Sequence, residues 1–209
     1  MDERQVVPDK PATASHSPED FDASYVGVPP WDIDRPQPAF EALAASGALT
    51  GKVLDVGCGT GEHALLAATT GLDAMGVDTA PRAIERAKKK AQERRVLARF
   101  EIWDAFKLPE LGERFDTVLD CGLFHVFSDE DRPRFVVSLA AVVPSGGRYF
   151  MLCFSDRQPG DWGPRRVSQA EIRGTFSDGW QVDAIEPTVI DITIDPDGAR
   201  AWLASITRR

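Results

Sequence analysis

Three glycines at alternate positions follow a short apolar run, and this stretch is the part of the sequence best suited to hold a ligand. Residues 53–56 have the composition of a buried strand, and Gly57, Gly59 and Gly61 come directly after it. Glycines let the backbone turn sharply and let a ligand lie against the main chain. Asp55 stands two places before the first glycine, so a ligand that carries a cationic group would be attracted here.

The spacing of these glycines differs from that of a dinucleotide-binding loop. A G-x-G-x-x-G loop would have its third glycine at position 62, where this chain has Glu62. Asp55 would also place a negative charge beside a pyrophosphate, whereas it would attract an amine. The pattern therefore argues against NAD. It leaves two alternatives, a site for a ligand with a cationic amine or a glycine turn in some other α/β fold.

Further polar residues come at the ends of the other predicted strands. Asp78 follows Gly57 by about twenty residues, where a carboxylate can accept hydrogen bonds from both hydroxyl groups of a ribose. Asp104 follows the third predicted strand, and residues 120–125 follow the fourth. Because the carboxyl ends of parallel strands lie at one edge of a sheet, these positions should meet there.

The elements that must position these residues alternate between strands and helices. After the fifth strand the pattern predicts two strands joined by a turn at Pro187, and then a last helix from residue 197 or 198 to residue 207. This order predicts an α/β fold, a doubly wound, mostly parallel seven-stranded sheet with helices on both faces. The predicted strands span residues 53–56, 73–77, 96–102, 115–119, 148–154, 180–186 and 189–194.

The composition argues against several functional classes. With 209 residues and a formal net charge of -9, the chain fits one α/β domain and lacks the basic excess of nucleic-acid-binding proteins. The one basic run, residues 86–95, is predicted to be the solvated face of a helix. No apolar stretch reaches membrane-spanning length, so we expect a cytoplasmic protein without a membrane partner. Cys58, Cys121 and Cys153 form no C-x-x-C pair, which argues against disulfides and zinc.

The segment Val53–Gly61, VLDVGCGTG, has the pattern D-x-G-x-G-x-G and resembles motif I of the class I S-adenosylmethionine-dependent methyltransferases. The resemblance covers about residues 53–154 and implies a Rossmann-like methyltransferase fold with S-adenosyl-L-methionine as cofactor. It implies that Asp55 and the glycine loop hold the methionine part, Asp78 the ribose and Asp104 the adenine amine. Each carboxylate also has a plainer alternative, since Asp55 could accept hydrogen bonds from loop amides and the others could serve a strand end or a turn.

A proline-rich segment, PPWDIDRPQPAF at residues 29–40, carries a second resemblance. It is similar to the W-D-x-G-R-x-x-P segment of the thiopurine and halide methyltransferase-like group, and of actinobacterial methyltransferases that modify heterocyclic toxins at a hydroxyl. There the segment closes over the cofactor, which implies that Trp31 stacks at the methionine end and that Arg35 pairs with a carboxylate or an adjacent acidic side chain. Asp34 stands where the group has glycine; if this position needs a positive φ, aspartate is a tolerable replacement. Alternatively, the prolines only stiffen a strap that packs Trp31 on the domain.

These observations divide the chain into three parts and define a candidate cofactor site. We expect a flexible N-terminal tail at residues 1–20, a cofactor-covering strap at residues 21–38 and the methyltransferase domain at residues 39–209. The candidate cofactor-binding residues are Trp31, Arg35, Asp55, Gly57, Cys58, Gly59, Gly61, His63, Asp78, Thr79, Trp103, Asp104, Ala105 and Cys121.

Methyl transfer from a sulfonium is an in-line displacement that needs a base only if the nucleophile arrives protonated. His125 is the candidate base, because it follows the fourth strand and imidazole titrates near neutral pH; a structural histidine under the cofactor is the alternative. The chain lacks the (D/N)-P-P-(Y/F) motif of many amino methyltransferases after this strand. It also contains no asparagine, which a catechol-type metal site would use, so we expect no metal.

Aromatic side chains on the predicted loops suggest the acceptor. They suit a flat, fairly apolar molecule that bears a hydroxyl or a thiol. We therefore expect O-methylation, or else S-methylation, of a small aromatic heterocycle, with no nucleic-acid partner. The alternatives are a halide or thiol methyltransferase and a non-catalytic module that binds S-adenosylmethionine. The candidate pocket residues are Val26, Trp31, Phe124, Phe127, Phe154 and Trp162.

Overall fold

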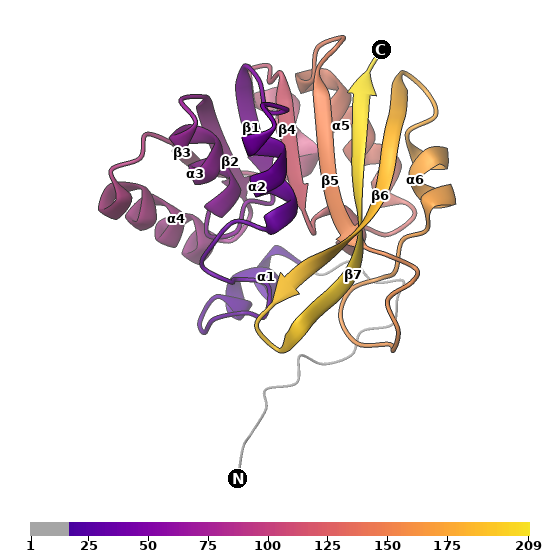
Figure 1. Ribbon diagram of the computed structural model, residues 1–209. Helices are drawn as coiled ribbons and strands as arrows, with labels where there is room; N and C mark the ends of the chain where they lie inside the picture. The colour runs from indigo at the N-terminus through magenta and orange to yellow at the C-terminus, as the bar shows by residue number, and fades with distance from the viewer. Residues whose placement is uncertain (1–16) are drawn as a thin grey trace.

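A seven-stranded sheet runs through the computed structural model, which describes residues 17–209 (Figure 1). The strand order is β3-β2-β1-β4-β5-β7-β6; β1 to β5 are parallel, and β7 pairs antiparallel with β5 and β6. The predicted doubly wound, mostly parallel sheet of an α/β fold is confirmed. The strands are β1 (Lys52–Val56), β2 (Asp73–Asp78), β3 (Arg99–Ile102), β4 (Thr117–Cys121), β5 (Arg148–Phe154), β6 (Trp180–Ile192) and β7 (Asp195–Arg208).

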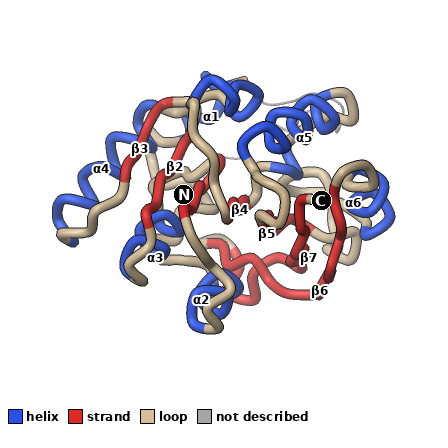
Figure 2. Tube along the Cα trace, turned by 90° about the horizontal axis from the view of Figure 1, so that it is seen from above, coloured by secondary structure: helices blue, strands red, loops and turns tan. Residues whose placement is uncertain are grey.

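Helices cover both faces of this sheet (Figure 2). Successive residues of a strand point to opposite faces, so Val53 packs in one apolar cluster with Phe40 of α2, and Leu54 packs in another with Phe135 of α5. The buried run in β1 therefore anchors both layers. The helices are α1 (Pro18–Ser24), α2 (Pro38–Ala45), α3 (Glu62–Thr69), α4 (Pro81–Arg94), α5 (Asp131–Val142) and α6 (Gln169–Thr175), with 3-10 turns η1 (Ala105–Leu111) and η2 (Phe124–Val126).

The C-terminal segment differs from the prediction. Residues 195–208 form strand β7 instead of a helix, and β6 continues through Pro187 without a turn. The local composition around Leu203 favours a helix, but β7 fills the place between β5 and β6, and pairing with two strands outweighs that weak preference. Pro187 is tolerated because β6 is the edge strand, where a proline nitrogen can face away from the sheet.

The β6–β7 hairpin bends away from the sheet toward the N-terminal strap (Figure 1). Near its tip the amide of Thr193 donates to the carbonyl of Pro30 at 2.9 Å. The strap begins within α1, which Ser17 caps through a hydrogen bond from the amide of Asp20. Residues 17–20 therefore belong to a capped helix and not to the predicted tail, and the rest of that tail lies outside the described residues.

Three further predictions concern membranes, metals and cysteines. None of the helices between residues 17 and 209 combines the length and the apolar composition that crossing a bilayer requires. In the same part of the chain, no three His, Cys, Asp or Glu side chains are grouped so that they could hold a metal ion. All three cysteines are free thiols.

Candidate active site

The glycine loop connects β1 to α3 through backbone conformations that favour glycine. Gly57, Gly59 and Gly61 all have positive φ, of 68°, 51° and 86°. At Gly59 an added Cβ would lie 2.7 Å from the hydroxyl oxygen of Tyr25. This glycine therefore also leaves room for the side chain of Tyr25, which stands at the C-terminal end of α1. The thiol of Cys58 is buried beneath the loop in a cluster with Phe100.

Asp55 is completely buried at the end of β1, and half of its carboxylate lacks a partner. Its Oδ2 accepts from the amide of Ala64 in the first turn of α3 at 3.0 Å, so its amide partner belongs to the helix after the loop and not to the loop that the alternative named. Its Oδ1 has no hydrogen-bond partner among the described residues. Burial raises the pKa of Asp55 to about 8. An unpaired buried oxygen is costly, so this atom is a place for a donor that the protein does not itself supply.

Asp78 joins the glycine loop to the start of α4. Its Oδ2 accepts from the amide of Gly59 at 2.8 Å, and its Oδ1 accepts from the amide of Ala80, next to Thr79, at 2.9 Å. Burial raises the pKa of Asp78. Because each carboxylate oxygen has two acceptor sites, both oxygens can accept further hydrogen bonds.

The third predicted cluster lies beside Asp78, at the end of β3. The amide of Trp103 donates to the carbonyl of Asp78 at 2.9 Å, which brings the two strand ends together. Asp104 caps η1 by accepting from the amide of Phe106 at 2.9 Å, and Ala105 is buried at its start. The structure therefore places Asp55, Asp78 and Asp104 along one edge of the sheet, as predicted.

The strap lies over this edge and brings a residue that the sequence analysis did not identify. Tyr25 is 4% exposed, and its hydroxyl accepts from Nε1 of Trp31 at 3.0 Å while it lies against Gly59. Trp31 contacts Tyr25 and Phe21 edge-on and remains 42% exposed. Burial and the nearby charge of Asp78 raise the pKa of the Tyr25 hydroxyl well above its usual value, so it stays protonated.

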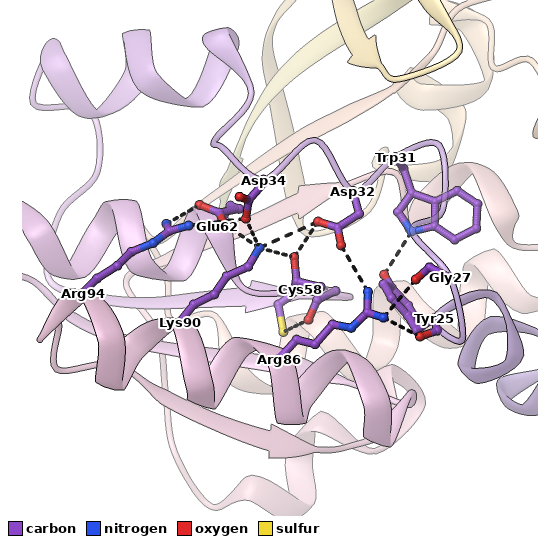
Figure 3. A network of polar contacts seen from close by, with 12 residues as sticks. Tyr25, Gly27, Trp31, Asp32, Asp34, Cys58, Glu62, Arg86, Lys90 and Arg94 are labelled. Atoms are coloured by element: carbon purple, nitrogen blue, oxygen red, sulfur yellow. Dashed lines mark hydrogen bonds and ion pairs between the residues drawn. The ribbon is translucent and has the colours of Figure 1, made fainter.

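A group of charged side chains, which we call the strap clamp, holds the strap against the domain (Figure 3). At its centre is Lys90 of α4, whose Nζ lies 2.7 Å from Glu62, 2.8 Å from Asp34 and 2.9 Å from the Thr60 hydroxyl. Thr60 in turn donates to Asp32 of the strap at 2.7 Å. The clamp thus connects the strap, the glycine loop, α3 and α4. Its members are Asp32, Asp34, Thr60, Glu62, Arg86, Lys90 and Arg94.

The basic run on α4 is therefore not only a solvated face, and that prediction is corrected. Arg86, Lys90 and Arg94 are four residues apart, so they share one face of the helix, and this face points to the strap. Arg86 donates to the carbonyls of Tyr25 and Gly27 at 2.8 and 2.9 Å. The sequence signal was the spacing itself, but a basic stripe does not reveal its partner.

Asp34 and Arg35 fit the strap in ways that the sequence anticipated in part. Asp34 has φ of 56°, the conformation for which glycine is the usual residue. Arg35 pairs with Asp191 of β6 at 2.6 Å, so its partner is the adjacent acidic side chain of the two alternatives.

Substitutions at Asp34 should reveal the cost of this backbone conformation. We expect Asp34→Gly to keep the free energy of unfolding within about 0.5 kcal/mol of the original, because the carboxylate is largely exposed and exposed ion pairs contribute little. Asp34→Ala should be less stable than Asp34→Gly by about 1 kcal/mol, since alanine disfavours positive φ. Urea unfolding followed by circular dichroism measures both values. Equal stability of the two variants would contradict this account.

His63, in the first turn of α3, also contacts the strap. Its Nε2 accepts from the amide of Gln37 at 3.2 Å, and its ring packs on Phe40 at a centroid distance of 4.6 Å. Burial lowers the pKa of His63 to about 4. Gln37 also exchanges two hydrogen bonds with the main chain of Asp191, at 2.9 and 2.8 Å. His63 therefore helps to hold the strap between α3 and the β6–β7 hairpin.

His125 lies after β4, in η2, with most of its ring buried. Its Nδ1 accepts from the amide of Phe154 at 3.0 Å, and burial with the charges of Arg132 and Arg166 lowers its pKa to about 3. Nδ1 is therefore occupied by a main-chain contact. Nearby, Asp120 is fully buried and accepts from the Tyr149 hydroxyl at 2.6 Å, which assigns it to the core.

The predicted pocket residues differ in how far they are buried. Phe124 and Phe127 belong to the apolar core beneath the sheet edge, and Val26 is 73% exposed, so these three are not brought together as a pocket wall. Phe154 is buried but contacts the rings of both His125 and Trp162. Cys121 is partly buried at the end of β4. Trp31 and Trp162 remain half-exposed on two loops, as their loop positions suggested.

Comparison with known proteins gives one family. A family model described as a methyltransferase domain matches residues 53–147. The 2-heptyl-1-hydroxyquinolin-4(1H)-one methyltransferase of Mycobacteroides abscessus is 36% identical over 178 residues, which cover 80% of this chain and 78% of that protein. Probable thiol methyltransferase 2 of Arabidopsis thaliana is 29% identical over 147 residues, 69% of this chain and 65% of that protein.

Two solved structures resemble this chain in fold. One, described by the conversion of a disulfide bond into a thioacetal group during echinomycin biosynthesis, has a TM-score of 0.83 and 35% identity and covers 92% of this chain and 93% of its own. Magnesium protoporphyrin IX methyltransferase from Synechocystis with bound S-adenosylmethionine has a TM-score of 0.64 at 23% identity, covering 81% and 76%, and shows the fold alone.

Proposed function

Because this chain belongs to the S-adenosylmethionine-dependent methyltransferases, we propose that it transfers the methyl group to a hydroxyl oxygen of a small aromatic heterocycle. A thiol sulfur is the second acceptor that the site could serve. The observation that carries the proposal is the 36% identity to a hydroxyquinolinone methyltransferase over most of both chains. The half-exposed aromatic rings of Trp31 and Trp162, on the two loops beside the glycine loop and His125, fit a flat acceptor.

The residues at the sheet edge fit S-adenosylmethionine. The unpartnered Oδ1 of Asp55 suits the ammonium group, and the positive-φ glycine loop leaves main chain open for the rest of the methionine part. Asp78 would accept from the ribose hydroxyls, and the segment of Trp103, Asp104 and Ala105 would border the adenine. When bound, the cofactor supplies a methyl carbon activated by a positively charged sulfur.

The chain's own residues supply alignment and exclusion of water. Tyr25 and Trp31 close the strap over the glycine loop, and the strap clamp and the β6–β7 hairpin hold it there. Alignment of nucleophile and methyl group in a dry site is the main requirement of an in-line displacement. None of these roles requires a metal.

Two other functions remain in competition with this one. The 29% identity to a probable thiol methyltransferase favours a thiol or halide acceptor as the first rival. The second rival is a module that binds S-adenosylmethionine without catalysis, for which the orphaned oxygen of Asp55 is equally suitable.

The test is incubation of the protein with S-adenosylmethionine and a panel of 1-hydroxyquinolin-4(1H)-one, hydroxyquinolines, a thiopurine and iodide, with products identified by mass. We expect O-methylated heterocycles as the main products, and turnover of iodide or the thiopurine alone would favour the first rival. Tight cofactor binding without any product would favour the second. Failure to bind S-adenosylmethionine, measured by calorimetry, would contradict the proposal altogether.

A further inference from the structure

The hydrogen bonding of His125 decides what this residue can offer an acceptor. Because Nδ1 accepts from the amide of Phe154 at 3.0 Å, the neutral ring carries its proton on Nε2. A Cβ added at Gly122, after β4, would lie 3.2 Å from Nε2, so this nitrogen faces the carboxyl end of the strand. The ring therefore has a hydrogen-bond donor and no free lone pair at this edge. It is poorly suited to remove a proton.

Two positively charged groups from different elements act on His125 through their charges, and with burial they lower its pKa. Arg132 of α5 lies over the ring of Phe124 at 4.6 Å, and its side chain is 4% exposed. Its Nη1 donates to Glu171 at 3.2 Å, but its Nε and Nη2 are buried without a partner among the described residues. A guanidinium with two unpaired buried nitrogens leaves an attractive potential for a negative charge.

Arg166 approaches from the loop before α6. Its guanidinium lies 5.3 Å from the ring of Phe154, which His125 contacts edge-on at 5.2 Å. Arg166 donates to the carbonyls of Pro164 and Trp162 at 2.6 and 2.8 Å. Carbonyls orient the group without cancelling its charge.

Carboxylates of this region have partners of their own. Asp120 accepts from the amides of Leu123 and Phe124 and from the Tyr149 hydroxyl, and two others are shared between Arg132 and a second arginine. Asp129 and Glu171 both pair with Arg165 as well as with Arg132. Asp161 acts on Arg166 only through its electrostatic field. The surroundings of His125 thus present a hydrogen-bond donor at Nε2 together with the charges of Arg132 and Arg166, which with burial lower the pKa of its ring.

From this arrangement, and resting on the proposed function, we infer that the acceptor binds as an anion, with Nε2 of His125 donating to its ionised oxygen or sulfur and with Arg132 and Arg166 stabilising its charge. The acceptor class is therefore acidic hydroxyls and thiols, those that ionise near or below neutral pH. The anionic atom forms the new bond to the methyl carbon as the carbon–sulfur bond breaks and its electron pair stays on sulfur. The negative and positive charges disappear together, and no proton has to be removed by the protein.

The direct test measures the ionisation of a bound acceptor without turnover. The protein is saturated with S-adenosylhomocysteine, which has no methyl group to transfer, and titrated with 4-nitrophenol and 1-hydroxyquinolin-4(1H)-one at pH values from 5 to 9. The absorption spectra of these probes differ between the neutral and ionised forms. We expect the apparent pKa of the bound probe to fall by at least one unit, about a tenfold shift. Binding in the neutral form, or no binding of either probe, would overturn the inference.

Substitutions of the arginines, with matched controls, show which side chains cause the pKa shift of the bound probe. Arg166→Met and Arg132→Met should each reduce the shift at least threefold, Arg132→Lys should restore most of it, and Arg134→Met, an exposed neighbour on α5, should leave it unchanged. Arg132 also lines a groove of about 630 Å³ between α5 and α6. If the probe bound in that groove instead, substitutions of His125 would not change the pKa shift of the probe. An unchanged shift in both methionine variants would overturn the inference.

Variants of His125 distinguish a role as hydrogen-bond donor from a role as general base. In His125→Gln the amide oxygen can accept from the amide of Phe154 while the amide nitrogen donates to the acceptor. We therefore expect this variant to retain the spectral shift and at least a tenth of kcat/KM. His125→Phe should lose both. If a base is needed, glutamine should fail as phenylalanine does, and kcat/KM should not follow the ionised fraction of a series of acceptors. Failure of the proposed function itself would be seen separately, as an absence of methylated product from every acceptor.

Discussion

Asp55→Asn is expected to weaken the binding of S-adenosylmethionine by about 10- to 100-fold, the range for losing a hydrogen bond to a charged group. The reason is that the unpartnered Oδ1 of Asp55 is the buried oxygen at the glycine loop that suits an ammonium group. Asparagine keeps the size of the side chain and can still accept from the amide of Ala64. Isothermal calorimetry with the purified variant measures the affinity. An affinity within threefold of the original would contradict the assignment.

The same residue should couple cofactor binding to protons. Burial raises the pKa of Asp55 to about 8, so the carboxyl is protonated at pH 7 before the cofactor binds. Pairing with an ammonium group requires the ionised form, so binding at pH 7 should release close to one proton, and affinity should rise between pH 6 and pH 8. Calorimetry in buffers of different ionisation enthalpy counts this proton. Asp55→Asn should release none.

The stability of the cofactor-free protein should show the matching trend. The folded-state pKa of Asp55, about 8, lies above the value of about 3.9 for an unfolded chain, so this contribution to stability is lost as pH rises through 8. His63 and His125 have folded-state pKa values of about 4 and about 3, below the value of about 6.5 for an unfolded chain. Their contribution to stability is therefore lost only as pH falls below about 6.5. Between pH 6.5 and 8 the loss from Asp55 dominates. We expect the free energy of unfolding to fall over this window, and Asp55→Asn to flatten the fall.

The parts of this site that the sequence predicted are those with a local pattern. The glycine loop, Asp78 and Asp104 each lie at the end of a short strand, and strand ends in a parallel sheet meet at one edge whatever the rest of the chain does. The five parallel strands were predictable for the same reason. Asp34 is an intermediate case, because only the comparison with a glycine pattern suggested its positive φ.

The parts that were missed depend on contacts between distant segments. Tyr25 reaches Gly59, and Lys90 reaches Asp34, across more than thirty and more than fifty positions, and nothing in either neighbourhood indicates the partner. Strand β7 was predicted as a helix because its alanines have helical preference, whereas its pairing with β5 is visible only in the fold. A signal did exist in the regular spacing of Arg86, Lys90 and Arg94, facing a strap with repeated aspartates. Matching the two charge patterns would have found the strap clamp.

Lys90→Met is expected to loosen the strap and, through it, the cofactor site. Lys90 is 15% exposed and holds Glu62, Asp34 and Thr60, so its loss leaves the buried Glu62 with Arg94 as its one cationic partner among residues 17–209. Removing one member of a partly buried ionic group typically lowers the free energy of unfolding by about 1 to 3 kcal/mol. We expect the same variant to bind S-adenosylmethionine at least fivefold more weakly, because Asp32 and Asp34 would repel Glu62 across the strap. Urea unfolding and calorimetry measure the two effects.

The control for this variant is on the same helix. Lys89→Met removes the same charge one position away, but Lys89 is 73% exposed and makes an i, i+4 pair with Glu93. It should change the free energy of unfolding by less than about 0.5 kcal/mol and leave cofactor affinity unchanged. Protease cleavage within residues 25–37 gives a third readout, because only an open strap exposes that backbone. If Lys90→Met is less stable yet binds the cofactor normally and resists cleavage, the clamp stabilises the fold without holding the strap closed.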